Sequence, residues 1–544
     1  MMVWRVAVIG AGCSGLVCIK TCVEEGLEPV CFESSDDIGG LWNFKESTQP
    51  ERSSIYRSLV ANTSKEMMCF SDFPMPDHYP NYMHNSLLLQ YFRLYAQHFN
   101  LLKYIHFQTT VTRVMQRPDF SFSGQWDVET VNQHGEEDHH VFDAVMVCSG
   151  NYSHPYLPMS EFTGSETFNG HLYHSWDYKD GERYKGKRVL VMGLGNSGAD
   201  IAVEVSRFAE KTFLSTRTGA WVAGRMSNSG LPIDMTHINR FYDTLTSLLP
   251  SRLLNWIIER SLNRKYDHRM YQLLPKHRAF DRLLINDELP YRILLGEVVM
   301  KSNVKEFNKS RVVFENDTEE EIDIVIFCTG YNSTLSFLPQ SLSQGPKGEL
   351  TLYKRVFPPS LQKPTLVVIG LLKAKGPIMP MVEMQARWAT AVFKGLDHLP
   401  TKDKMLTFIE TERKRNMKSY PCPLEAAQQV DYIPYLDFMA DKVGVKPHFL
   451  GLLLRDPVLW VKVFFGPCTS YQFRLSGPGQ WSGARQAILS QWKRLQRPFN
   501  TREIPEPNIR ASAWSVWLLA LGGSLLMAAF VQNKIEDNTL LWFK

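Results

Sequence analysis

The sequence lacks paired cysteines. Its nine cysteines are spread over 544 residues, and no two of them stand in a CxxC arrangement. A redox disulfide or a zinc site would need such a pair, so the pattern argues against a dithiol oxidoreductase and against a bound metal. We interpret the cysteines as buried, reduced thiols.

The sequence also has little excess charge and no secretory signal. Sixty basic and 56 acidic residues leave a net charge of +4, which provides no field for nucleic-acid binding. The stretch Val6–Leu16 is apolar, but its glycine spacing is typical of a strand and a turn and not of a signal peptide. With 44% apolar residues, the chain has room for two or three domains with cores of their own.

A first glycine-rich motif lies near the N-terminus. It reads Gly10-Ala11-Gly12-Cys13-Ser14-Gly15 and follows the apolar run Trp4–Ile9, while a second apolar run, Pro29–Phe32, ends at Glu33. This order predicts a strand, a tight turn and a helix whose N-terminal amides face a pyrophosphate. The acid after the second strand would accept hydrogen bonds from free ribose hydroxyls. The motif therefore predicts an FAD site.

A second glycine-rich motif has the opposite charge after it. It reads Gly193-Leu194-Gly195-Asn196-Ser197-Gly198 behind the run Arg188–Met192, and the following strand, Thr212–Leu214, ends in Ser215-Thr216-Arg217. Hydroxyls and a cation at that place suit a 2′-phosphate, so this site is predicted to bind NADPH. Two such sites in one chain imply hydride transfer from nicotinamide to flavin. Glycines that only turn the chain are the alternative, which the strand before and the helix after each motif disfavour.

Further apolar runs complete the predicted architecture. We expect an α/β fold with two Rossmann-like dinucleotide-binding domains, one for FAD and one for NADPH, a helical insertion and a C-terminal membrane-anchoring helix. Strands at Ala144–Val147 and Ile322–Phe327 should end the two units, and Pro364–Leu371 should return to the first. The predicted divisions are an FAD part at 1–155, an NADP part at 156–330 with a membrane-facing insertion at about 230–285, a return to the FAD part at 331–445, a helical region at 446–512 and an anchor at 513–531.

The longest uncharged stretch lies near the C-terminus. Nineteen uncharged residues run from Ala513 to Val531, enough for a helix that approaches the roughly 30 Å of a bilayer core. We expect a single anchor in the endoplasmic reticulum membrane with the body in the cytosol, the alternative being a buried soluble helix. Arg240–Leu274 and Phe449–Gly466 are apolar and basic, and would either lie in the membrane interface or pack on the body as ordinary amphipathic helices.

A third motif indicates a family. Residues 168–178, FNGHLYHSWDY, fit the pattern FxGxxxHxxxY and stand just before the second glycine-rich motif. Four more segments carry the same resemblance: Asp36-Asp37-Ile38-Gly39-Gly40-Leu41-Trp42, Asn62-Thr63-Ser64-Lys65-Glu66-Met67-Met68-Cys69-Phe70, Cys328-Thr329-Gly330-Tyr331 and Gln385-Ala386-Arg387-Trp388. Over its whole length the chain resembles the mammalian-type microsomal flavin-containing monooxygenases, also called the dimethylaniline monooxygenase family.

The resemblance implies a two-stage reaction. NADPH reduces FAD, NADP+ stays bound, and the reduced flavin holds oxygen as a C4a-hydroperoxide until a soft nitrogen or sulfur nucleophile of a lipophilic small molecule attacks it. Such a site needs dryness and geometry more than positioned acids and bases. Membrane lipid is a further expected partner, and the oligomeric state is left open.

The resemblance also implies which residues serve each cofactor. Those expected to hold FAD are Gly10, Ala11, Gly12, Cys13, Ser14, Gly15, Glu33, Gly40, Leu41, Trp42, Asn62 and Thr63. Those expected to contact NADP are Ala61, Asn62, Gly193, Gly195, Asn196, Ser197, Gly198, Ala199, Ser215, Thr216 and Arg217. Asn62 is the candidate catalytic residue because an amide can donate and accept hydrogen bonds without bringing in charge; the alternative is a turn residue that caps the next segment. His174 and Tyr178 are expected in the linker, without a role in proton transfer.

Departures from the family pattern keep other functions open. Thr218 stands where a second arginine is common, which weakens the predicted preference for NADPH over NADH. Lys373 and Lys375 stand where an uncharged run is expected, and facing the flavin they would admit water. The alternatives to nitrogen and sulfur oxygenation are therefore Baeyer-Villiger oxygenation of ketones and a poorly coupled NADPH oxidase or weakly active flavoprotein.

Overall fold

The computed structural model describes residues 4–279, 283–332, 335–342, 350–418 and 427–502. The chain packs as two compact units, Met1–Pro498 and Phe499–Lys544. All contacts described below lie within the first unit. Both nucleotide-binding motifs, with every predicted cofactor residue, belong to it.

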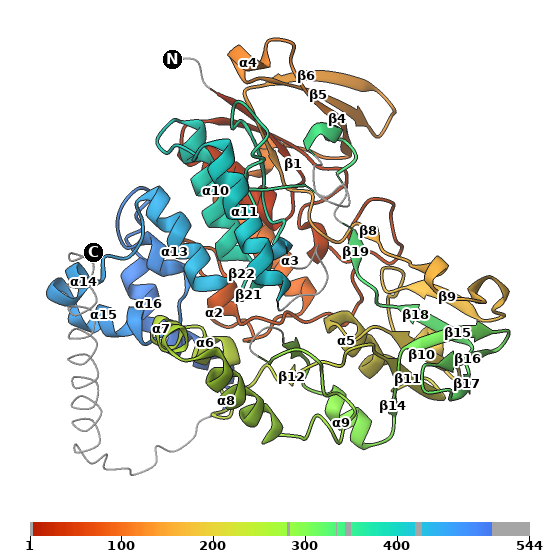
Figure 1. Ribbon diagram of the computed structural model, residues 1–544. Helices are drawn as coiled ribbons and strands as arrows, with labels where there is room; N and C mark the ends of the chain where they lie inside the picture. The colour runs from red at the N-terminus through yellow and green to blue at the C-terminus, as the bar shows by residue number, and fades with distance from the viewer. Residues whose placement is uncertain (1–3, 280–282, 333–334, 343–349, 419–426, 503–544) are drawn as a thin grey trace, which may run out of the picture. The chain divides into compact units, whose positions relative to one another are not determined.

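The first glycine-rich motif lies in a five-stranded parallel sheet with the strand order β20-β7-β1-β2-β3. Its strands are β1 (Arg5–Ile9), β2 (Glu28–Phe32), β3 (Ile105–His106), β7 (Ala144–Val147) and β20 (Leu366–Val368). Apolar runs buried on both faces are typical of parallel strands, and β7 is buried throughout. Because β20 pairs with β7, this sheet takes strands from both sides of residues 156–330 in the sequence (Figure 1).

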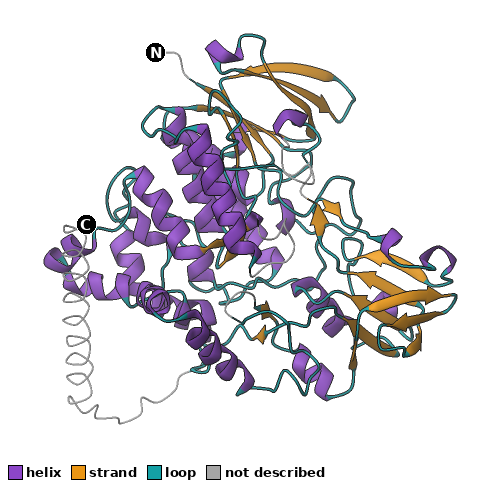
Figure 2. Cartoon of the chain, in the orientation of Figure 1, coloured by secondary structure: helices purple, strands orange, loops and turns teal. Residues whose placement is uncertain are grey.

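The second glycine-rich motif lies in another five-stranded parallel sheet, with the order β14-β11-β10-β18-β9. Its strands are β9 (His171–His174), β10 (Arg188–Met192), β11 (Lys211–Ser215), β14 (Val298–Lys301) and β18 (Ile324–Phe327). The FxGxxxHxxxY motif thus forms the edge strand β9 beside β18. Figure 2 shows the strands of the two sheets as separate groups, in orange.

Shorter strands complete the β structure. Two three-stranded antiparallel sheets are made by β4 (Thr109–Gln116), β5 (Trp126–Asn132) and β6 (Glu137–Phe142), and by β15 (Val304–Asn308), β16 (Arg311–Phe314) and β17 (Glu319–Glu321). The two-stranded pairs are β8 (His154–Pro155) with β19 (Tyr331–Asn332), β12 (Val222–Ala223) with β13 (Leu284–Ile285), and β21 (Lys373–Lys375) with β22 (Gln429–Asp431).

Helices follow the two glycine-rich motifs and fill the rest of the unit. The α-helices are α1 (Cys13–Glu24), α2 (Lys65–Met68), α3 (Asn85–His98), α4 (Phe120–Ser123), α5 (Asn196–Val205), α6 (Ile233–His237), α7 (Arg240–Leu248), α8 (Ser251–Asn263), α9 (Leu289–Leu294), α10 (Met379–Phe393), α11 (Lys402–Met417), α13 (Tyr432–Val443), α14 (Phe449–Arg455), α15 (Pro457–Phe464) and α16 (Ala484–Gln496). The 3-10 helices are Gly40–Trp42, Leu102–Tyr104, Met159–Glu161, Ser165–Thr167, Glu182–Tyr184, Gln340–Leu342, Ser470–Arg474 and Arg497–Phe499.

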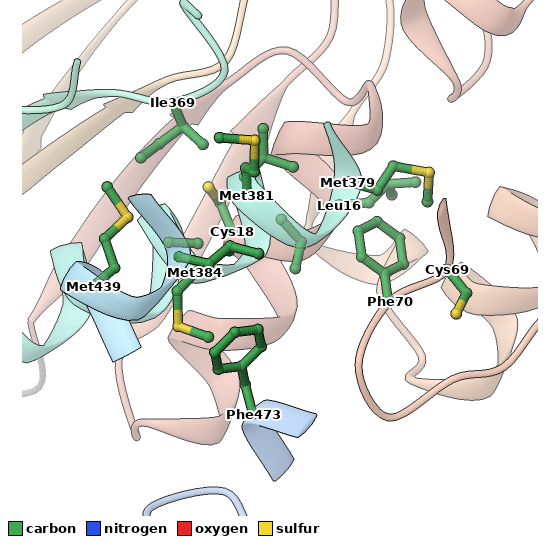
Figure 3. Close-up of a cluster of buried hydrophobic side chains, with 14 of the residues drawn as sticks. Leu16, Cys18, Cys69, Phe70, Ile369, Met379, Met381, Met384, Met439 and Phe473 are labelled. Atoms are coloured by element: carbon green, nitrogen blue, oxygen red, sulfur yellow. The ribbon is translucent and has the colours of Figure 1, made fainter. Parts of the chain in front are cut away.

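A sulfur-rich core holds α1 in place. Leu16 and Cys18 of α1 are fully buried in one cluster with Met381 and Met384 of α10 (Figure 3). Methionine side chains are flexible and polarizable, so they fill the irregular space between two helices well. The packing of α10 on α1 therefore fixes the helix that begins at the first glycine-rich motif.

A buried ionic network attaches the later part of the unit to this core. Arg474 is 1% exposed and lies 2.9 Å from a carboxylate oxygen of Glu383 and 3.1 Å from one of Asp72. Lys20 of α1 pairs with the same Asp72. Breaking a buried ion pair leaves an unpaired charge, so the network makes these contacts specific. It connects α1, α10 and the 3-10 helix at Ser470–Arg474.

His174, in the FxGxxxHxxxY motif, is a neutral packing residue. The backbone N–H of Trp176 donates to its Nδ1 at 3.1 Å, so its Nε2 carries the proton and donates to the Gly330 carbonyl at 3.0 Å. Burial lowers the pKa of His174 to about 4. The side chain is therefore uncharged at neutral pH and connects β9 to the turn after β18.

We expect His174 to make the protein sensitive to acid. The pKa of His174 is about 6.5 in the unfolded chain and about 4 in the native protein. Between these two pH values the unfolded state binds a proton that the native state does not bind, so the stability that the neutral ring contributes is lost as pH falls from 6.5 to 4. Between pH 7.5 and 5 the free energy of unfolding should fall by about 2 kcal/mol more in the wild type than in His174→Gln. Denaturant unfolding at the two pH values measures it, and equal falls in both proteins would refute the prediction.

Candidate functional site

The first glycine turn, residues 10–15, brings α1 so close to β1 that no side chain fits at Gly10 or Gly15. Gly10 has a positive φ of 100°, and a Cβ there would lie 2.9 Å from the Cys148 carbonyl oxygen. A Cβ on Gly15 would lie 1.8 Å from the Gly10 oxygen. In the described structure no side chain caps the helix at Gly12, so the first N–H groups of α1 are available to an anion.

A second backbone segment closes on this turn. A Cβ on Gly40 would lie 3.1 Å from the Gly12 Cα, and the Gly39 N–H donates to the Ala11 carbonyl at 3.1 Å. The 3-10 helix Gly40–Trp42 therefore lies beside the turn, with Leu41 and Trp42 half-buried. The structure thus brings Gly40, Leu41 and Trp42 together with residues 10–15.

Glu33 is fixed at the end of β2, where the sequence places a ribose-binding acid. It is 6% exposed, and its Oε2 accepts from the Ala11 N–H at 2.6 Å. Its Oε1 accepts from the N–H and the hydroxyl of Ser35, at 2.9 and 2.8 Å. A carboxylate has about four acceptor sites, so one remains for ribose hydroxyls. The donor set around this turn fits FAD.

The second glycine turn, residues 193–198, repeats the geometry of the first. Gly193 has a φ of 108°, and a Cβ on it would lie 2.6 Å from the Cys328 carbonyl oxygen. A Cβ on Gly198 would lie 1.9 Å from the Gly193 oxygen, so α5 packs on β10 as α1 packs on β1. A Cβ on Gly195 would meet no described atom within 4 Å. The middle glycine thus leaves open space for a pyrophosphate, and the turn fits a dinucleotide.

The residues from the last position of β11 onward differ in their exposure and hydrogen bonds. Ser215 is buried, and its hydroxyl donates to the Ser302 carbonyl at 2.8 Å. The Thr216 hydroxyl accepts from the Gly219 N–H at 3.1 Å, whereas Arg217 and Thr218 are exposed. Arg217 is therefore accessible, and its predicted pairing with a 2′-phosphate stays a prediction. Contacts of Ser215 and Thr216 with this phosphate stay a prediction.

Asn62 is held by an arginine from the second half of the site. Its Oδ1 accepts from Arg225 Nη2 at 2.7 Å, and the neighbouring Ala61 carbonyl accepts from Arg225 Nε at 3.3 Å. A guanidinium only donates, so the amide oxygen must face it and Nδ2 must point elsewhere. Among the described residues no acceptor lies within hydrogen-bonding distance of Nδ2. Asn62 therefore presents a neutral donor.

The segment after Asn62 is fixed from the same side. The Ser64 N–H donates to Asp234 Oδ2 at 2.6 Å. Asp234 is the second residue of α6 and is 5% exposed. Burial raises the pKa of its carboxyl group. Residues 61–64 thus have hydrogen bonds to Arg225 and Asp234 at their two ends. This arrangement fits a positioned amide and leaves Thr63 half-buried beside it.

Sequence reasoning missed Arg225, Asp234 and Asp287. Arg225 Nη1 lies 2.8 Å from Asp287 Oδ2, and each residue follows the end of one of two paired parallel strands, β12 and β13. Charged residues after adjacent strand ends are a usable signal, but strands of two residues leave no pattern to detect. Asp234 carried no signal at all.

The two unexpected lysines lie in β21. The register pairs Lys375 with Asp431 of β22, and Lys375 Nζ lies 3.2 Å from an Asp431 carboxylate oxygen. Lys373 and Lys375 are both half-buried. The charge of Lys375 is therefore balanced, and an effect of the two lysines on a flavin stays a prediction.

No helix in the described ranges is long and apolar enough to cross a membrane. The predicted anchor at 513–531 lies outside the described residues. The expected division into FAD and NADP domains also stays a prediction, since residues 1–498 pack as one unit.

Comparisons with known proteins agree with this geometry. A family model described as flavin-binding monooxygenase-like matches residues 3–534. The chain is 51% identical to dimethylaniline monooxygenase [N-oxide-forming] 2 of Rattus norvegicus, covering 92% of this chain and 94% of that protein. It is 47% identical to flavin-containing monooxygenase 5 of Homo sapiens, covering 97% and 99%.

Solved structures show the same fold at low identity. S-allyl-L-cysteine S-oxygenase from Allium sativum matches with a TM-score of 0.61 at 23% identity, covering 84% of this chain and 95% of that one. The closed crystal structure of cyclohexanone monooxygenase matches with a TM-score of 0.59 at 17% identity, covering 81% and 97%. Two glycine turns of one geometry, an asparagine held as a donor and a family match along nearly the whole chain lead to one conclusion. The chain belongs to the flavin-binding monooxygenase-like family and is an oxidoreductase with FAD and NADPH as cofactors and O2 as co-substrate.

Proposed function

We propose that this monooxygenase oxygenates soft nucleophilic nitrogen or sulfur atoms of lipophilic small molecules. The bonding of Asn62 carries the proposal: its amide oxygen is occupied by Arg225 and its NH2 group is left to donate. Oxygen transfer to a soft nucleophile calls for a neutral donor beside the reacting oxygen and for no strong acid or base. The rat relative, whose name states N-oxide formation, supports nitrogen as one target.

The cofactor chemistry follows from the two glycine turns. Bound FAD would accept a hydride from NADPH and then activate O2 at its C4a atom. In the first turn, α1 amides would hold the pyrophosphate and Glu33 the ribose. In the second turn, Gly195 would admit the NADPH pyrophosphate and Arg217 would pair with the 2′-phosphate. Asn62 would donate to the oxygen being transferred or to the nicotinamide carbonyl, and would exclude water by its packing.

A membrane surface is the second part of the proposal. Helices α14 and α15 expose Leu454 (76%) and Val458 (60%), and the Phe241 ring of α7 lies 5.2 Å from the ring of Phe465 beside them. Helix α8 exposes Trp256 (56%). These exposed apolar residues come from α7, α8, α14 and α15, which lie near one another in Figure 1, and exposed apolar residues on neighbouring helices are typical of a membrane interface. We propose that this surface lies on the cytosolic face of the endoplasmic reticulum membrane.

The proposed function is tested by removing the NH2 donor of Asn62 with Asn62→Asp, which also adds a negative charge beside Arg225. FAD-loaded protein with NADPH, O2 and dimethylaniline or a dialkyl sulfide should give N-oxide or sulfoxide. Asn62→Asp keeps an acceptor for Arg225 but has no NH2 group, so product formation should fall on the order of 10²-fold while anaerobic flavin reduction changes little. Product chromatography and flavin absorbance measure the two steps.

Three outcomes of this test separate the functions. Unchanged product formation in Asn62→Asp would remove Asn62 from its role. An ester from a ketone, without amine or sulfide oxidation in the wild type, would assign Baeyer-Villiger chemistry. Hydrogen peroxide in place of any product would assign an uncoupled oxidase. Asn62→Ala, which removes the donor and the acceptor but adds no charge, is the comparison that separates the loss of the donor from the effect of the added charge.

In the second glycine turn, two similar substitutions should have different effects, one on NADPH binding and the other on folding. Gly195→Ala adds a methyl group where no described atom lies within 4 Å, so folding and FAD content should be unchanged while NADPH affinity falls at least about tenfold. Gly198→Ala places a Cβ 1.9 Å from the Gly193 oxygen and should impair folding itself. NADPH titration and thermal unfolding of both variants measure this. Equal NADPH affinity in Gly195→Ala and the wild type would exclude this turn as the NADPH site.

The membrane proposal predicts contact between Trp256 and acyl chains. The full chain is reconstituted in vesicles whose lipids carry bromine on the acyl chains, because bromine quenches tryptophan fluorescence on contact. Trp256→Phe should lose part of the quenched signal. Trp4→Phe, at another exposed tryptophan, is the matched control and should leave the quenched fraction unchanged. The same quenched signal in Trp256→Phe and the wild type would place α8 away from the lipid.

A further inference from the structure

Residues 285 and 286 contact α5, the helix of the second glycine turn. The Ile285 N–H donates to Asn196 Oδ1 at 3.2 Å. The Asn286 side chain donates to Asp200 Oδ1 at 2.7 Å. Asn196 and Asp200 stand four residues apart on α5, so they lie on one face of that helix. Two consecutive residues thus bind the helix that begins at the proposed NADPH pyrophosphate site.

The next residue, Asp287, fixes Arg225. Its Oδ1 accepts from the Arg225 backbone N–H and its Oδ2 from Arg225 Nη1, both at 2.8 Å. Parallel pairing of β12 with β13 explains why Asp287 meets Arg225, because it places the ends of both strands at one edge of this two-stranded sheet. Backbone and side chain of the arginine are therefore held by a single carboxylate.

Arg225 in turn determines how Asn62 is oriented. Its Nη2 and Nε bind Asn62 Oδ1 and the Ala61 carbonyl, so the guanidinium is held by Asp287 on one side and by residues 61–62 on the other. An amide can rotate by half a turn and exchange its donor for its acceptor at little cost. A fixed guanidinium allows only one of the two orientations, since it has donors alone.

The chain before Asn62 is bound to the same helix. The Tyr56 hydroxyl donates to Asp200 Oδ2 at 2.6 Å, and the Ser58 hydroxyl donates to Glu204 Oε2 at 2.5 Å. Asp200 therefore joins Tyr56 to Asn286 through its two oxygens. Residues 56–62 contact α5 directly at one end and through residues 286–287 and Arg225 at the other.

We propose that residues 285–287 form a positioning bridge between α5 and Asn62, with Asp287 as the positioning residue that sets the orientation of the Asn62 amide. The inference rests on the proposed role of Asn62 toward the nicotinamide nucleotide. Its consequence is energetic coupling: binding of NADP+ at the second glycine turn and alignment of Asn62 depend on the same chain of hydrogen bonds. Loss of Asp287 should act on NADP+ binding through Asn62.

The neighbouring Glu288 supplies a matched control. It is half exposed, and its carboxylate pairs with Arg207 at 2.6 Å and with Arg292 at 3.1 Å. Neither arginine binds residues 61–62 in the described structure. Glu288→Gln therefore removes the same charge one residue away from Asp287 without touching the bridge.

The experiment is a double-mutant cycle on NADP+ binding. The FAD-loaded full chain is titrated with NADP+ as wild type, Asp287→Asn, Asn62→Ala and the double variant, and the dissociation constant is read from flavin fluorescence. Each single substitution should raise the dissociation constant of NADP+ about five- to tenfold. The double variant should have the same dissociation constant as whichever single variant binds NADP+ more weakly, because both substitutions break one chain of contacts. Glu288→Gln should stay within about twofold of the wild type.

Several outcomes would overturn the bridge. Fold-changes that multiply in the double variant would show two independent contacts, and an unchanged dissociation constant in either single variant would break the link between Asp287 and Asn62. Thermal unfolding of the FAD-loaded variants identifies a misfolded protein, and in that case Arg225→Lys replaces Asp287→Asn in the cycle, since lysine keeps the charge but cannot bind Asp287 and Asn62 together. None of these readouts needs substrate turnover. A failure of nitrogen or sulfur oxygenation therefore leaves the test of the bridge intact.

Discussion

The structure depends on close contact between a helix and a strand, made twice at glycine. At Gly15 and at Gly198 any Cβ would lie within 2 Å of the carbonyl oxygen of the glycine that directly follows the preceding strand. Each helix therefore begins directly over its strand, with first-turn amides that no described side chain caps. Both cofactor sites follow from this one steric condition, because an uncapped helix start next to a glycine turn is where a pyrophosphate binds.

The orientation of the Asn62 amide depends on charges that neither glycine turn contains. Asn62 belongs to a segment between β2 and β3, yet its orientation is set by Arg225 and, through it, by Asp287. A guanidinium that has a carboxylate on one side can hold an amide oxygen on the other without leaving its own charge unbalanced. The free NH2 group of Asn62 is thus oriented by residues more than 150 positions further along the chain.

Much of the fold was predictable because it repeats simple patterns. The strands β1, β2, β7, β10 and β18 are apolar runs that stop at a glycine, an acid or a cysteine, and the sequence places them within two residues of their observed bounds. The position of Glu33 followed from the same reasoning. The pairing of Arg225 with Asp287 did not, because β12 and β13 have two residues each and their register is decided by the surrounding packing. The buried network of Arg474, Glu383 and Asp72 joins residues that are far apart in the sequence, 91 positions for the nearest pair, and had no local signal either.

The sequence by itself determined that the chain has two dinucleotide-binding motifs and that a cation follows the strand after the second motif. Both can be recognised locally, because they depend on glycine spacing and on the charge at a strand end. It also determined the family, through motifs that need no partner in space to be recognised. Only the tertiary structure decided that the Asn62 amide oxygen faces Arg225, which leaves its NH2 group without an acceptor among the described residues, and that His174 is neutral with the proton on Nε2. Both depend on which donor or acceptor lies opposite a side chain, and that is fixed by contacts between segments that the chain order does not bring together.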